Sequence, residues 1–219
     1  MHFVGKLKAS AREFWREKIL LFIALFIVVA TIAFFAFSNT FESRNDFYQA
    51  HDLHPVQKNQ SMFPLDVFKL SVPVLFILDT LIIWGWNSFV VLLNRYFAIM
   101  LVSPLFFFYQ FIVKVPAFPN LGMELSLFFR TSATALPAHD TLRLVVLVGY
   151  SVVEATLDLF WKLVCTKEII VIIRKYRKYN SKVWVEYLDG SHVKGMYLLY
   201  MLLLLPCAIS ESLCVHVLQ

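Results

Sequence analysis

Apolar residues in this 219-residue chain are grouped in long runs, and most runs are near the length that crosses a membrane. A helix spans the hydrocarbon core with roughly 20 mostly apolar residues. The strands of a membrane barrel would instead alternate polar and apolar residues about every second position. The pattern therefore predicts an all-α integral membrane protein, a polytopic helical bundle. Its five predicted spans are residues 19–37, 71–93, 96–113, 144–165 and 196–213.

The polar segments between these runs predict the rest of the organisation. Residues 1–18 mix Phe and Trp with basic residues, which is typical of an amphipathic helix at the membrane interface. Asn94 and Arg95 alone separate the second and third spans, which predicts a tight helical hairpin there. Two longer polar segments, 38–70 and 114–143, are predicted to be loops on the outer side.

The inner side is predicted to carry a basic segment, residues 166–194. Its apolar and polar residues alternate around Asp189-Gly190, a dipeptide that favours a two-residue β-turn. The segment therefore predicts a small β-hairpin on the inner side, which would need a packing partner because an isolated hairpin is marginal in water.

Composition supports a membrane location and argues against several other classes. Hydrophobic residues make up 59% of the chain and charged residues only 16%, whereas soluble domains carry about a quarter charged residues. The pair His51 and His54 falls in a polar loop without Cys, so no metal site and no cofactor are predicted. The three cysteines are too dispersed for a disulfide framework and are interpreted as free thiols.

The positions of Lys and Arg predict the orientation of the chain. Basic residues are retained on the cytoplasmic or matrix-like side, and the five-span arrangement places 14 of the 20 on one side and six on the other. The N-terminus is therefore predicted inside and the C-terminus outside. The inner cluster is predicted to contact anionic lipid headgroups through Arg174, Lys175, Arg177 and Lys178. Nucleic acid is not a predicted partner, because the net charge of +5 lies beside spans.

Ionisable residues inside the predicted spans are the candidate functional groups, because they are costly in lipid. In the fourth span, four polar residues recur at steps of three or four and form one stripe that cannot face lipid; they are Ser151, Glu154, Asp158 and Lys162. Asp158 and Lys162 can pair along the helix. In the second span, Asp79 and Asn87 need partners, bound protons or water in the same way.

Three functions are consistent with these polar residues. The chain is interpreted first as a non-catalytic subunit or scaffold of a larger membrane complex, such as an energy-converting or respiratory assembly, whose acids pair with basic residues of other subunits. The alternatives are a small proton- or ion-coupled transporter or channel that uses Glu154 and Asp79, and a lipid-modifying membrane enzyme that also uses His139 or His192. The basic N-terminus is consistent with the mitochondrial inner membrane, and the sequon at Asn59 with a secretory-pathway membrane.

Overall fold

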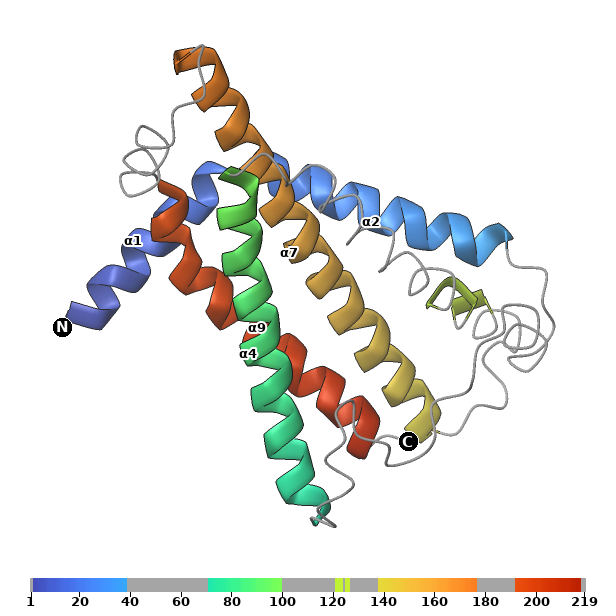
Figure 1. Cartoon of the computed structure of the whole chain (residues 1–219). Helices are drawn as coiled ribbons and strands as arrows, with labels where there is room; N and C mark the ends of the chain where they lie inside the picture. Colours follow the sequence, from blue (N-terminus) through green and yellow to red (C-terminus); the bar gives the residue numbers. More distant parts are fainter. Residues whose placement is uncertain are drawn as a thin grey trace.

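The structure, a computed structural model, describes residues 2–38, 71–99, 121–123, 125–126, 138–176 and 192–217. All regular structure in these residues is helical (Figure 1). The main helices are α1 (His2–Arg16), α2 (Lys18–Ser38), α4 (Val72–Ile99), α7 (Ala138–Tyr176) and α9 (His192–His216). Stretches of α2, α4, α7 and α9 are long and apolar enough to cross a membrane. The predicted helical, multi-span class is confirmed at this level, with four candidate spans in the described part of the chain.

The predicted hairpin between the second and third spans is wrong at the position of its turn. Helix α4 continues through Asn94 and Arg95 and ends at Ile99. Both residues are tolerated in a helix interior, because each keeps the backbone N–H that a proline would remove. The remainder of the predicted third span, residues 100–113, lies outside the described residues.

Helix α7 is longer than the predicted fourth span at both ends. Its 39 residues give a length of about 58 Å, almost twice the roughly 30 Å of a hydrocarbon core. Residues 166–176, predicted as part of the inner segment, are therefore a continuation of this helix.

Helix α9 is also longer than the predicted fifth span. It begins at His192, passes through Pro206 and ends at His216. Residues 192–194, at the end of the predicted β-hairpin, are helical. The turn of that hairpin, Asp189-Gly190, lies outside the described residues.

Helices α4 and α7 run in the same direction, and α9 packs against both in the opposite direction (Figure 1). The α4–α9 direction follows from two contacts, since Tyr197 near the start of α9 meets Ser88, whereas His216 at its end meets Asp79 near the start of α4. Helix α2 runs opposite to α7, beginning beside Lys167. The C-terminal ends of α2 and α9 therefore lie on the same side of the bundle as the N-terminal ends of α4 and α7.

The main core lies where α1, α7 and α9 meet α4. Its centre is the aromatic trio Phe160, Trp161 and Tyr200, all at most 1% exposed. The Trp161 and Tyr200 rings are 4.9 Å apart, and Phe14 of α1 lies 4.9 Å from the Phe160 ring. These contacts seat the N-terminal helix on the bundle, because offset aromatic pairs add to the stabilisation from burial.

A second apolar cluster joins α2 to α7 and to a short helical stretch near residue 121. Val28 and Ile32 of α2 pack with Leu121 and with partly buried residues of α7. Gly122 makes the closest approach, because a Cβ added there would lie 2.5 Å from the Phe35 Cβ and 2.8 Å from α2 backbone atoms. A side chain at this position would force the two segments apart.

Candidate functional site

The polar stripe of α7 faces the other helices of the bundle, as the sequence predicts. Lys162 Nζ lies 2.7 Å from Asp158 Oδ2, and their side chains are only 7% and 19% exposed. The predicted pair along the helix is therefore present. Ser151 lies one turn from Glu154 and is half-buried.

Glu154 is joined to α4 across the bundle. Asn87 Nδ2 donates a hydrogen bond to Glu154 Oε1 at 3.3 Å, and both side chains are partly buried. Glu154 therefore accepts a hydrogen bond from a neutral amide of the same chain. The sequence identified both residues as needing partners, but it did not pair them with each other.

Asp79 is held by a histidine that lies outside the predicted spans. His216 Nε2 lies 2.6 Å from Asp79 Oδ2, and the two side chains are 1% and 2% exposed. His216 falls beyond the predicted fifth span, which ended at residue 213. Its spacing from Ser212 places the two on one face of α9, and this helical continuation is the signal that could have identified it.

Aromatic hydrogen-bond donors form a further set of contacts between helices. The Trp161 indole donates to the Val91 carbonyl at 3.0 Å, and the Trp84 indole donates to the Met201 carbonyl at 2.9 Å. The Tyr197 hydroxyl donates to the Ser88 carbonyl at 2.8 Å. These contacts tie α4 to α7 and α9. They are not predictable from the sequence, because their acceptors are backbone carbonyls.

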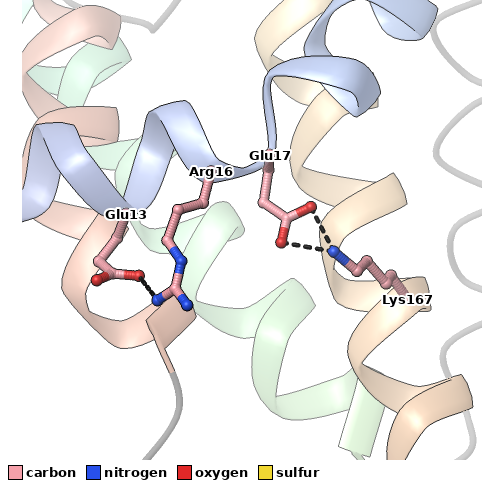
Figure 2. Close-up of polar contacts among 4 residues, drawn as sticks. All are labelled: Glu13, Arg16, Glu17 and Lys167. Carbon is pink, nitrogen blue, oxygen red and sulfur yellow. Dashed lines mark hydrogen bonds and ion pairs between the residues drawn. The ribbon is translucent and has the colours of Figure 1, made fainter.

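The junction of α1 and α2 is fixed by an ion pair at the opposite end of the bundle from His216. Figure 2 shows Lys167 of α7 reaching Glu17, with Nζ 2.7 Å from both carboxylate oxygens. Glu17 is buried directly after the end of α1, and its spacing from Ser10 and Phe14 continues the buried face of that helix. The chain therefore turns between α1 and α2 at a residue anchored to α7.

A second ion pair of this region lies within α1, beside the junction (Figure 2). Arg16 Nη1 is 2.7 Å from Glu13 Oε2. The hydrogen bond and the negative charge of Glu13 raise the pKa of the Arg16 guanidinium. Because this pair is open to solvent, it adds little to stability.

The residues predicted to contact anionic lipid lie at or beyond the end of α7. Arg174 is exposed in the last turns of the helix, and Lys175 belongs to the same helix. Arg177 and Lys178 lie outside the described residues. Contact with lipid headgroups remains a prediction for all four.

Several buried polar atoms have no hydrogen-bond partner in the described part of the chain. They are Ser88 Oγ, Thr156 Oγ1, Glu168 Oε1, Tyr200 Oη and Ser212 Oγ. Four of these are hydroxyl oxygens, and they lie on α4, α7 and α9. No group of three or more His, Cys, Asp or Glu residues that could hold a metal ion occurs among the described residues.

The polar groups of the bundle thus occupy three levels along its length. Asp79 and His216 form one level, Asn87 and Glu154 a second, and the Asp158–Lys162 pair a third. Chemically, this arrangement can hold helices together, and the acids and the histidine can also exchange protons.

No protein-family model, curated protein sequence or solved structure matches the chain.

Proposed function

We propose that the chain is a non-catalytic structural subunit of a larger membrane assembly. The observation that carries this proposal is the pairing of its intramembrane acids within the chain itself. Asp79, Glu154 and Asp158 each have a polar partner on α4, α7 or α9. The Asp79–His216 and Asn87–Glu154 contacts join different helices and can hold them in one arrangement, which is what a scaffold requires, whereas the Asp158–Lys162 pair lies within α7.

The exposed aromatic surface supports an assembly role. Phe22, Phe26, Phe34 and Phe37 of α2 are each more than 60% exposed, and Trp86 of α4 is 57% exposed. Such a surface suits contact with lipid and with other membrane helices, because packing between spans relies on close van der Waals contact. The acids have partners in this chain rather than depending on neighbouring subunits, so an intersubunit contact would use the apolar faces.

Purification in a mild detergent followed by mass measurement tests the structural role. We expect the 25.5 kDa chain to copurify with other membrane proteins in a fixed ratio. A monodisperse single chain, recovered both from mild detergent and after cross-linking in intact membranes, would overturn the proposal.

Glu154→Gln separates this role from proton transport. The glutamine oxygen can still accept the hydrogen bond from Asn87, so we expect abundance and assembly to change little. Glu154→Leu serves as the matched comparison, because it removes the acceptor, and we expect it to lower the yield of the assembly. Equal assembly of both variants would show that the Asn87–Glu154 hydrogen bond has no structural role.

Proton- or ion-coupled transport is the second candidate, favoured by the Asp79–His216 pair. Both groups can exchange protons, both are buried, and the unpartnered Ser212 hydroxyl lies one turn away on the same face of α9. Proton flux into liposomes holding the purified chain tests this candidate. Flux that Asp79→Asn abolishes in a folded protein would support it, and no flux above that of empty liposomes would refute it.

We also infer that the chain crosses the membrane five times with its N-terminus on the basic side. Support comes from α4 and α7, which run in the same direction, so the chain must return from one end of the bundle to the other between Ile99 and Ala138. Leu121 and Gly122 already lie beside the far half of α2.

Cysteine-accessibility labelling tests this topology on a variant without the three native cysteines. Single cysteines at positions 58 and 177 should be labelled from opposite sides of the membrane. Labelling of both from the same side would contradict the five-crossing arrangement.

A further inference from the structure

An apolar cavity opens between α2 and α7 on the side of the bundle where α2 ends. Its volume is about 530 Å³, within the roughly 300–1,000 Å³ of known ligand sites. Five of its lining residues come from α2, between Val29 and Phe37, and two come from α7, Val148 and Val152. Leu125 and Ser126 complete the described lining, and Ser126 is its one hydroxyl. In Figure 1, α2 and α7 separate toward this end, with the short helical stretch between them.

The described lining of this cavity suits hydrocarbon rather than water. A buried water needs two to four polar partners, and the described lining offers one side-chain hydroxyl. An empty cavity would forfeit the dispersion contacts of every lining side chain. The cavity adjoins the lipid-facing side of α2, where Val29 is 48% and Phe37 91% exposed, so lipid chains have direct access to it.

The dimensions distinguish a lipid chain from a helix of another protein. The lining residues of α2 run from Val29 to Phe37, a length of about 12 Å, close to the roughly 15 Å depth of one leaflet. A helix is about 10 Å across, whereas an extended hydrocarbon chain is much thinner and can lie along the whole lining between α2 and α7.

We propose that this cavity, here called the α2–α7 groove, is a binding site for one acyl chain of a membrane phospholipid. The chain lies along Val29–Phe37 with its headgroup toward the end of α2. This proposal rests on the membrane location of the chain and is independent of its assembly with other subunits. A bound lipid would fill the groove that the separation of α2 and α7 leaves open.

Native mass measurement of the purified chain, with and without a bulky residue in the groove, tests the proposal. Ala33 lines the groove, and Ala33→Phe places a ring where the acyl chain would lie. Ala30 is an exposed residue of the same helix that does not line the groove, so Ala30→Phe is the matched control. We expect wild type and Ala30→Phe to retain one phospholipid in detergent, and Ala33→Phe to retain about tenfold less.

Photolabelling provides a second measurement that does not depend on the folding of a variant. The wild-type chain is reconstituted in phosphatidylcholine vesicles with a diazirine on the acyl chain, transferred to probe-free detergent, and then irradiated. The retained lipid should label residues 29–37 and 148–152. Labelling confined to the exposed stretch 22–27, no retained lipid, retention of a free fatty acid alone, or equal retention by both phenylalanine variants would overturn the proposal.

Discussion

Removing His216 alone should destabilise the protein more than removing both partners of the Asp79–His216 pair. In His216→Leu the Asp79 carboxylate stays buried without its imidazole, and a broken buried pair costs about 3–5 kcal/mol. In Asp79→Ala the imidazole loses its partner, which costs about 1–3 kcal/mol for an unsatisfied buried group. Both side chains are at most 2% exposed, so solvent cannot compensate for either loss.

The double variant, Asp79→Ala with His216→Leu, provides the decisive measurement. Alanine and leucine together roughly replace the combined volume of the pair, and an apolar replacement of a buried pair is often neutral, with a packing cost of about 1–2 kcal/mol. The two single losses add to about 4–8 kcal/mol, so the double variant should be about 2–7 kcal/mol more stable than that sum would make it. Asp79 makes a further interaction in the chain, and the cycle isolates the histidine contact from it.

The unfolding free energy can be measured by titrating the protein in mixed micelles with a denaturing detergent. Thr80→Val provides the control, because Thr80 is the buried neighbour of Asp79 and its hydroxyl donates to the Phe76 carbonyl of its own helix. Combined with His216→Leu, it should give additive losses to within about 0.5 kcal/mol. Additive losses for Asp79→Ala and His216→Leu as well would refute the pairing, and with it the observation on which the structural role depends.

Two further predictions concern the attachment of α2 at its two ends. Gly122→Ala should destabilise the protein by about 1–3 kcal/mol because its Cβ would clash with Phe35, whereas Gly149→Ala, where nothing lies within 4 Å, should stabilise α7 by about 0.5–1 kcal/mol. Thermal unfolding in detergent checks both variants, and equal shifts would contradict the close approach. Lys167→Met should cost about 1–3 kcal/mol, because the Glu17 carboxylate is only 6% exposed and loses this partner, and it should increase tryptic cleavage beside Glu17. Unchanged cleavage would show that the ion pair does not anchor the junction.

Uninterrupted apolar runs made the first span predictable almost to the residue. The predicted span is residues 19–37, and α2 is Lys18–Ser38. The agreement is close because the charged Lys18 precedes the apolar run and the polar Ser38 follows it. The end of the second span was misplaced because Asn94 and Arg95 were interpreted as a turn. Polarity alone does not end a helix that keeps its backbone donors.

The polar stripe of α7 was predictable because charged side chains cannot face lipid. The partners of that stripe were not predictable from the sequence. In a membrane both the lipid-facing and the protein-facing sides of a helix can be apolar, so the pattern of α4 and α9 does not fix their rotation. Asn87 meeting Glu154, and His216 meeting Asp79, depend on that rotation.

The distribution of polar contacts explains why the groove lies beside α2 rather than elsewhere in the bundle. Helices α4, α7 and α9 are joined along their lengths by hydrogen bonds from Trp84, Trp161 and Tyr197. The hydroxyls of α2 instead donate to its own carbonyls, from Thr31 to Ile27 and from Ser38 to Phe35.

Polar attachment of α2 to α7 occurs at its start, through the Glu17–Lys167 pair, and its far half depends on apolar packing with Leu121 and α7. Apolar packing between helices gains little over packing with lipid tails, because both environments are hydrocarbon. The far half of α2 can therefore separate from α7 at low cost, and an acyl chain in the gap restores most of the contacts that the separation removes.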